Sequence, residues 1–314
     1  MACSGSSSSK APRAAVLAWT LAGAPFGALA AQSSHLTLLE RSAPASAVEP
    51  VSVVAGDGWL AAWLAPAAGG RSTGLLAGIE HNGFAALTTV LVAARFHAGP
   101  SWQISFAQTS VKDLFDPALV EQYPGLAALG ASATQVAADA VKRLGPAFLS
   151  VGARYERDEL LGDATTAWLA RASAATPFVL GVRAAVVVEH PLNGTTVSAG
   201  ATRLTAGLAR SFTVGRVGLD WGAGASLGDV WALGRARRLL ATSLRLSLLD
   251  LVSLSAGVGT ERDPFGSGDW LGYAAFGLGV RVGGFGADLR RGGPADALAS
   301  PMAVSLLWEP RPRP

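Results

Sequence analysis

Residues 243–259, SLRLSLLDLVSLSAGVG, contain two runs in which large apolar residues alternate with small or polar ones. Every second residue of the first run is leucine, and the alternation returns at Val252 after an interruption at 249–251. A period of two places the large apolar side chains on one face of a β-strand and the small or polar ones on the other. The stretch therefore predicts two antiparallel strands joined by a turn.

Similar alternating blocks recur between about Thr73 and Trp308. Hydrophobic residues make up 50% of the chain and charged residues 15%, with a mean hydropathy of +0.36, whereas about a quarter of the residues in a soluble domain are charged. Beyond the first 31 residues, however, the sequence contains no apolar run of the ~20 residues that a spanning helix needs. The pattern predicts an all-β, antiparallel transmembrane β-barrel of about 12 to 14 strands, with its apolar face toward lipid. An alanine-rich soluble β-sandwich is the alternative.

The first 31 residues have the pattern of a secretory signal. Lys10 and Arg13 precede an uncharged apolar run that ends in Ala28-Leu29-Ala30, a small-x-small cleavage pattern. A membrane-spanning anchor is the alternative, but the glycines and Pro25 inside the run favour cleavage. A barrel behind a cleavable signal predicts location in the outer membrane of a bacterial cell.

The charge balance after cleavage argues against nucleic-acid binding. Cleavage after Ala31 leaves 314 − 31 = 283 residues, and it removes two of the 25 basic groups and none of the 22 acidic ones. The remaining balance is 23 − 22 = +1, without a basic run that contains aromatic residues. Cys3 leaves with the signal, so the mature chain is expected to have neither disulfides nor thiolate metal sites.

One segment, 116–144, interrupts the strand rhythm. It contains an alanine-rich stretch at 137–144, and Thr134 is available as a helix cap. We therefore expect a short helical insertion there, in a long loop at one rim or folded into the lumen. The expected organisation is a signal peptide at 1–31, an N-terminal arm or plug-like segment at 32–70, the barrel at 71–309 and a Pro/Arg tail at 310–314.

No catalytic, cofactor-binding or metal-binding constellation is predicted. The four histidines are widely separated, and none belongs to a helical zinc-binding pair. Glycine pairs such as Gly222-x-Gly224 lie inside strand alternation and lack a following lysine, so close packing explains them better than phosphate binding. The acidic positions at 261–269 are too few for a dedicated calcium loop. We expect a non-enzymatic protein, since no nucleophile, base and orienting group stand out together.

The polar face of the predicted strands is mostly glycine, alanine and serine. Charges on that face form a small set of candidate lumen or ligand-facing residues: Asp220, Arg245, Arg281, Asp288 and Arg290. Small residues dominate around them, so a narrow or plugged lumen is expected rather than a wide ion pore. Most tryptophans fall near predicted strand ends, where interfacial aromatic girdles lie.

Residues 55–67, AGDGWLAAWLAPA, carry a resemblance to the PorV/PorQ family of outer-membrane barrels, which are themselves similar to FadL-type fatty-acid transporters. In that family an acidic, small-residue turn precedes an Asn-Pro-Ala motif. Asp57 supplies the acid here and Pro66 and Ala67 the end of the motif, while Ala65 stands in place of the Asn. The resemblance implies a barrel of about fourteen strands that serves either transport of hydrophobic compounds or type IX secretion.

Two functions follow from these observations. The first is passage, or lateral release, of a small hydrophobic molecule across the outer membrane, and the second is a protein-interaction barrel of a secretion or surface-attachment system. The expected partners are outer-membrane lipid together with either a hydrophobic small molecule or a secretion-machinery protein. No nucleic acid and no cofactor are expected.

Overall fold

The structure, a computed structural model, describes most of the chain beyond residue 72. The described residues are 66–69, 73–82, 87–111, 121–122, 131–160, 163–176, 179–194, 202–227, 238–262, 270–294 and 302–308. The predicted signal peptide, the tail at 310–314 and most of the 32–70 segment therefore lie outside the described residues.

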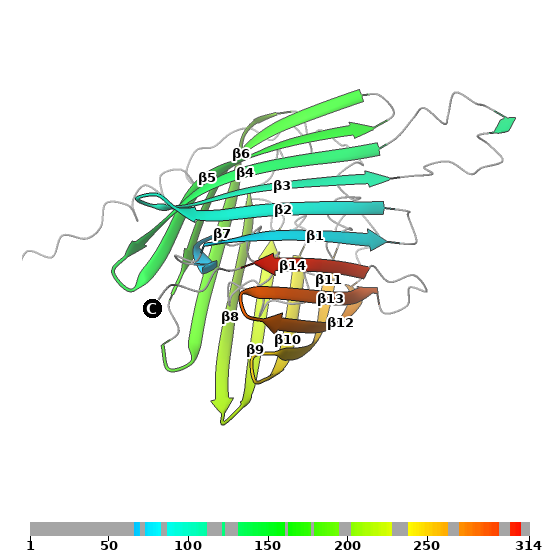
Figure 1. The fold of residues 1–314 in the computed structure, drawn as a ribbon. Coiled ribbons are helices and arrows are strands. Elements are labelled where there is room, and N and C mark those ends of the chain that lie inside the picture. The colour runs from blue at the N-terminus through cyan, green and yellow to red at the C-terminus, as the bar shows by residue number, and fades with distance from the viewer. Residues whose placement is uncertain are drawn as a thin grey trace, which may run out of the picture. The chain divides into compact units, whose positions relative to one another are not determined.

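Fourteen antiparallel strands close into a barrel, because β1 pairs with β14 as well as with β2 (Figure 1). The strands are β1 (Gly74–Asn82), β2 (Leu87–His97), β3 (Ser101–Val111), β4 (Ala131–Leu144), β5 (Ala147–Leu160), β6 (Asp163–Ala175), β7 (Val182–Gly194), β8 (Arg203–Val214), β9 (Val217–Leu227), β10 (Arg238–Leu248), β11 (Val252–Arg262), β12 (Trp270–Val282), β13 (Phe285–Pro294) and β14 (Met302–Trp308). A short 3-10 helix, η1 (Pro66–Gly69), precedes them. The predicted all-β barrel of 12 to 14 strands is confirmed.

The register keeps the large apolar residues on one face. Leu246 lies opposite Leu254 on β11 and Leu219 on β9, and all three belong to the outward-facing set. Side chains of this kind remain exposed on almost every strand, as with Ile104, at 46%, and Leu306, at 59%. Full closure leaves no unpaired strand edge, which is the condition for a sheet to cross lipid. No helix among the described residues is long and apolar enough to cross a membrane.

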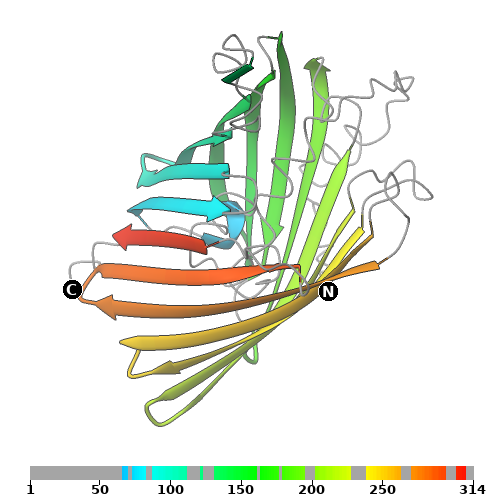
Figure 2. The ribbon, with the colours of Figure 1, turned by 90° about the vertical axis from the view of Figure 1, so that its right-hand side faces the viewer.

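The two ends of the barrel differ in their connections. At one end, which we call the short-turn end, two to six residues join β2 to β3, β4 to β5, β6 to β7, β8 to β9, β10 to β11 and β12 to β13. The start of β1 and the end of β14 lie at this same end, since Leu75 pairs with Trp308. Most connections at the other end, the loop end, are longer. Bacterial barrels turn their short connections toward the periplasm, so the short-turn end is the periplasmic one (Figure 2).

The helical insertion predicted at 137–144 is wrong. These residues form the second half of β4, and the proposed cap Thr134 lies in the same strand. The inner face of β4 contains Ala137 and Asp139, and its outer face contains Val136 and Ala138. Alanine occupies both faces, so the period of two is hard to see in the sequence, and alanine's helix propensity suggests the other assignment. In the barrel, pairing with β3 and β5 provides hydrogen-bond partners for the backbone N–H and C=O groups of this segment, and this stabilises the strand.

Two turn signals of the sequence have different outcomes. A Gly-Gly pair predicts a two-residue hairpin turn, and Gly283-Gly284 does join β12 to β13, with Gly283 at φ +68°, a conformation that glycine adopts without strain. Pro191-Leu192-Asn193-Gly194 also predicts a turn by its composition, and this prediction is wrong, because β7 continues to Gly194. Its pairing with β6 shifts register between Trp168 and Leu169, which accommodates Pro191 inside a paired strand.

Candidate functional site

Small residues predominate on the inner face of β9–β12. Glycine, alanine and serine alternate there with the large apolar residues of the outer face. This small-residue wall consists of Gly218, Gly222, Gly224, Ala241, Ser243, Ser247, Ser253, Ser255, Gly257, Gly259, Ala275, Gly277 and Gly279. Short side chains leave the wall close to the level of the backbone.

The inner face of β4–β7 has the opposite character. Five ionised side chains, which we call the charged network, converge there from four adjacent strands: Asp139, Arg154, Glu156, Arg171 and Glu189. Each side chain is 7% exposed or less. Buried charges are tolerated where they are paired with opposite charges, and each of these five side chains lies within ion-pair distance of an opposite charge.

Glu189 is the centre of the charged network. Its Oε1 lies 2.9 Å from Arg154 Nη1 and 3.1 Å from Arg171 Nε, so one carboxylate joins two guanidinium groups. Arg171 reaches in the other direction to Asp139, and Arg154 to Glu156, at 3.1 and 2.6 Å. The result is a continuous chain of ion pairs from β4 to β7 along the inner face.

A glycine makes room for the network. Gly152 lies opposite Asp139 on β4 and Arg171 on β6. A Cβ at this position would collide with the Ala138 carbonyl oxygen and the Asp139 carboxylate. Only the bare glycine backbone therefore lets the Asp139–Arg171 pair close across β5.

The network continues into polar neighbours at both sides. Gln135 Nε2 donates to Glu156 Oε1 at 3.3 Å, and Arg203 lies directly opposite Glu189 in the β7–β8 register. Asp158 is the next inward residue after Glu156 and is 5% exposed. Among the described residues, no three His, Cys, Asp or Glu side chains are grouped so as to hold a metal ion.

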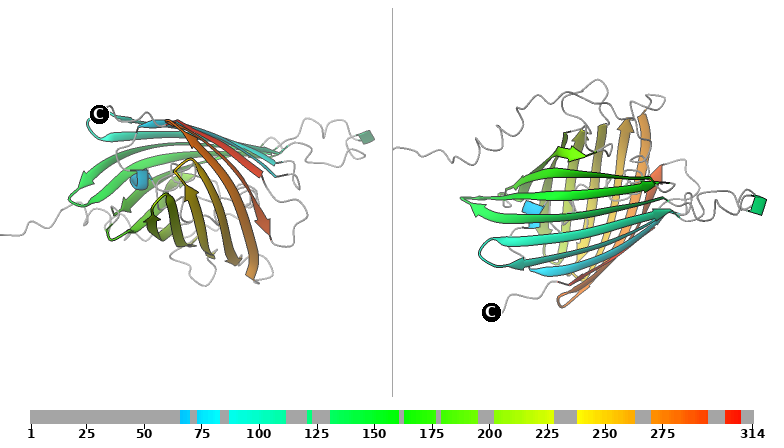
Figure 3. Two further views of the ribbon diagram at one scale, coloured as in Figure 1. Left: turned by 60° about the horizontal axis from the view of Figure 1, so that its bottom comes forward. Right: turned by 90° about the horizontal axis from the view of Figure 1, so that it is seen from above.

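The short helix η1 lies against the inner face of the same strands, β4–β6 (Figure 3). Ala67 is fully buried. It belongs to a cluster of buried residues with Ala175, Ala185, Val187 and Ala209, and the partly buried Phe148 packs against this cluster. Its backbone N–H donates to Ser173 Oγ at 3.1 Å, and Ser173 also bonds Ser150 on β5. The part of the N-terminal segment that the structure describes thus contacts the barrel wall from inside.

The residues predicted from the sequence lie on the inner face in two places. Asp220 and Arg245 form an ion pair across β9–β10, with Arg245 Nη2 and Nε 2.8 and 3.0 Å from Asp220 Oδ2. The others belong to β12 and β13: Arg281 opposite Gly286, Asp288 against Gly279 and Arg290 opposite Gly277. Of the motif residues, Pro66 and Ala67 form part of η1, and Asp57 lies outside the described residues.

Sequence reasoning missed the charged network. Because a helix was predicted at 137–144, Asp139 was not expected in the barrel wall. Arg171 and Glu189 lie in predicted strands, but they were not among the predicted lumen-facing charges. A signal was present in Arg154-x-Glu156-x-Asp158, where three charges of mixed sign share one strand face. The pairing of neighbouring strands was needed to show that their partners stand beside them.

Comparisons with known proteins show the fold class but no family. No family model and no curated protein matches the chain. Among solved structures, the CymD monoaromatic hydrocarbon channel aligns with a TM-score of 0.52 and 10% identity, over 84% of this chain and 97% of that one. Omp33 of Acinetobacter baumannii aligns at 0.47 and 10%, covering 76% and 99%. CdiB of the same organism aligns at 0.45 and 10%, and the match spans 76% of this chain and only 60% of CdiB.

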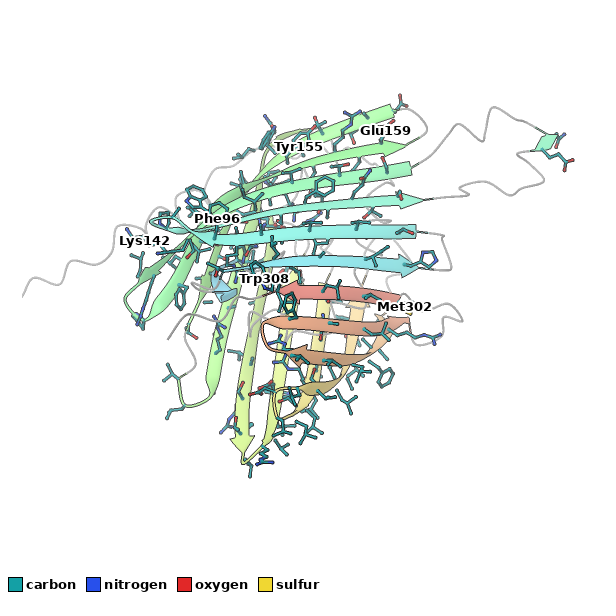
Figure 4. All side chains as sticks on the ribbon, in the orientation of Figure 1. Phe96, Lys142, Tyr155, Glu159, Met302 and Trp308 are labelled. Atoms are coloured by element: carbon teal, nitrogen blue, oxygen red, sulfur yellow. The ribbon has the colours of Figure 1, made fainter. Side chains whose placement is uncertain are left out.

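The exposed surface of the barrel is that of a membrane protein. A closed fourteen-strand barrel with large apolar side chains exposed around its outer face is stable in lipid and would aggregate in water. Figure 4 shows that the labelled Phe96 and Trp308 lie toward the short-turn end, and Glu159 and Met302 toward the loop end. The protein is a bacterial outer-membrane β-barrel.

Proposed function

We propose that this barrel passes small, uncharged hydrophobic compounds across the outer membrane and has no enzymatic activity. The observation that carries the proposal is the neutralisation of its inner face. Ion-selective pores use rings of like charge exposed to the permeating ion. Here the five side chains of the charged network are paired and buried, and the inner surface of β9–β12 is mostly glycine, alanine and serine.

The small-residue wall supplies the route in this proposal. Its side chains are short, and two of the charged residues beside it, Asp220 and Arg245, are paired with each other. CymD, which aligns over most of this chain, is described as a monoaromatic hydrocarbon channel. We therefore take monoaromatic hydrocarbons as the first class of compound to test. The resemblance to the PorV/PorQ family supports the same class of function.

The test is uptake of radiolabelled toluene by intact bacterial cells with a lipopolysaccharide outer leaflet, with and without the barrel. We expect faster accumulation with the barrel, and loss of most of that gain in Gly257→Phe, which adds bulk to the small-residue wall. Ala256→Phe is the matched control, since Ala256 is the preceding residue of β11 and faces outward. Uptake equal in cells with and without the barrel, or a large steady ion conductance in planar bilayers, would refute the proposal.

The second candidate function is a protein-interaction barrel of a secretion system. The burial of η1 against the inner wall favours it, because a segment docked inside the barrel suits a scaffold as well as a channel. A type IX-like role predicts reproducible co-purification of the same secretion component from native membranes, with no effect of Gly257→Phe on toluene uptake.

A further inference from the structure

Several turns at the short-turn end have exposed apolar residues, where a connection in water would be polar. We call this group the apolar rim: Val179, Leu180, Val214, Leu249, Leu251, Val282 and Phe285. Leu180 is 93% exposed, Val214 80% and Phe285 67%. A contiguous exposed apolar surface of this kind marks a contact with another phase or molecule.

The rim is one continuous surface, because backbone hydrogen bonds join neighbouring turns. Ser211 N–H donates to the Gly181 carbonyl at 2.7 Å, which ties the β6–β7 turn to β8. Leu249 N–H donates to the Arg216 carbonyl at 2.8 Å, and Arg281 N–H to the Leu251 carbonyl at 2.7 Å. The connections from β6 to β13 therefore form a single edge of the barrel.

Two leucines of the rim occupy the left-handed backbone region. Leu180 has φ +52° and Leu249 has φ +57°. Turn positions of this kind normally take glycine, asparagine or aspartate, which tolerate the conformation and interact with water. Leucine at both positions indicates that its side chain contributes something that outweighs the backbone strain.

The turns of β2–β3 and β4–β5 differ. The first consists of Ala98-Gly99-Pro100, next to the exposed His97, and the second is flanked by Lys142 and Arg143. Arg143 Nε donates to the Gly145 carbonyl at 3.0 Å, as expected of a solvated polar turn. Exposed apolar residues on this side, Phe96, Trp102 and Leu144, lie in the adjoining strands, whereas most of the rim residues lie in or directly beside the turns.

The position of the hydrocarbon band places the apolar rim within it. On the outer face, Arg262 ends the apolar run of β11 at the loop end, and Val252 lies ten residues away beside the turn. Ten residues of a strand tilted by ~45° span about 23 Å, and the apolar band of such barrels is about 25 Å tall. On β13 only six residues separate Arg291 from Phe285, about 14 Å, so the band extends past the turn.

Basic residues beside the rim match lipid headgroups. The Arg210 guanidinium lies 4.4 Å from the centroid of the Phe212 ring, and Phe212 is the residue nearer the turn. Its charge is therefore directed toward the periplasmic face of the membrane, as in a side chain that snorkels. Arg216 lies in the β8–β9 turn itself and is exposed.

We propose that the apolar rim is embedded in the inner leaflet of the outer membrane. Its valine, leucine and phenylalanine side chains lie among phospholipid acyl chains, and Arg210 and Arg216 contact the phosphates of anionic phospholipids. The β2–β3 and β4–β5 turns lie in periplasmic water. The barrel is therefore inserted asymmetrically, deeper on the β6–β13 side.

The test measures the environment of single labelled cysteines in the full-length barrel with Cys3→Ser. Val214→Cys and Leu249→Cys report on the rim, and Ala98→Cys, in the opposite turn, is the control. Each is labelled with bimane and reconstituted in phosphatidylcholine vesicles that contain phosphatidylglycerol. We expect brominated lipid to quench both rim labels at least threefold more than the control label, and aqueous iodide to show the reverse order.

Strong iodide quenching at 214 and 249 with no effect of brominated lipid would overturn the proposal. The rim would then lie in water, as expected of a binding surface for a periplasmic protein. The headgroup contact is tested by the ratio of quenching by brominated phosphatidylglycerol to that by brominated phosphatidylcholine. We expect about a twofold preference that falls to one in the Arg210→Gln/Arg216→Gln double variant. A ratio of one in the protein with both arginines would overturn the headgroup contact.

Discussion

The inner surface has two contrasting parts, the charged network of β4–β7 and the small-residue wall of β9–β12. Each contains an arginine–aspartate ion pair, but the two pairs differ in their exposure to water. In the network, side chains fill the space between strands, and the Arg171–Asp139 pair is 1% exposed on each side. In the wall, side chains are short, and the Arg245–Asp220 pair keeps 21% and 16% of its surface exposed. An ion pair that has lost its water is sensitive to the removal of either partner, whereas a hydrated pair is not.

The largest effect that separates the two parts is expected from Arg171→Met. The substitution leaves Asp139 and Glu189 buried without one of their guanidinium partners. Loss of one member of a buried pair costs about 3–5 kcal/mol. We expect a fall of that order in the free energy of unfolding, measured by urea titration in lipid vesicles with heat-modifiable gel migration as the readout.

Arg245→Met is the matched control, because it breaks an arginine–carboxylate pair of similar geometry on the other wall. Its expected cost is about 1 kcal/mol or less, since water can solvate Asp220 in the absence of the arginine. Equal costs for the two substitutions would show that both walls are hydrated and would remove the basis of the comparison.

A smaller effect is expected from Gly152→Ala. The added methyl group would collide with the Ala138 carbonyl and the Asp139 carboxylate, so β5 must shift or the Asp139–Arg171 pair must open. Overpacking of this kind costs about 1–3 kcal/mol. The same urea titration measures it.

Gly286→Ala is the control, because it tests whether alanine at any inward-facing glycine position lowers the free energy of unfolding. At Gly286 the nearest atoms to an added Cβ are Arg281 Cγ at 3.4 Å and Leu307 Cβ at 3.6 Å, which is ordinary contact. We expect a change within about 0.5 kcal/mol there, as for substitutions away from special features. A similar loss at both glycines would mean that the intrinsic preference of alanine, and not the network, determines the cost.

The contrast also explains how much the sequence could predict. The wall of β9–β12 was predictable, because strict alternation of large and small residues, as in 243–259, assigns each residue to a face. The network was not, because its strands are rich in alanine and the ion pairs that join different strands connect residues 18 to 35 positions apart, such as Arg171 with Glu189 and Arg154 with Glu189. Alternation identifies the face of a residue, but strand register is needed to identify its neighbour.

The smallest of these effects concerns η1, which contacts β4, β5 and β6 of the network. Ser173→Ala removes the acceptor of the Ala67 N–H, which is buried. One such hydrogen bond contributes about 1 kcal/mol, so the docked state of η1 should become several-fold less favoured. The measurement is the rate of maleimide labelling of Ala67→Cys in the Cys3→Ser background.

Ser253→Ala, an inward serine of the small-residue wall, is the control for this last prediction. We expect labelling at residue 67 to accelerate several-fold in Ser173→Ala and to stay unchanged in Ser253→Ala. Acceleration in both variants would indicate that η1 responds to the stability of the whole barrel. Acceleration in neither would mean that the apolar contacts of Ala67 with Phe148, Val187 and their neighbours hold η1 in place without the hydrogen bond.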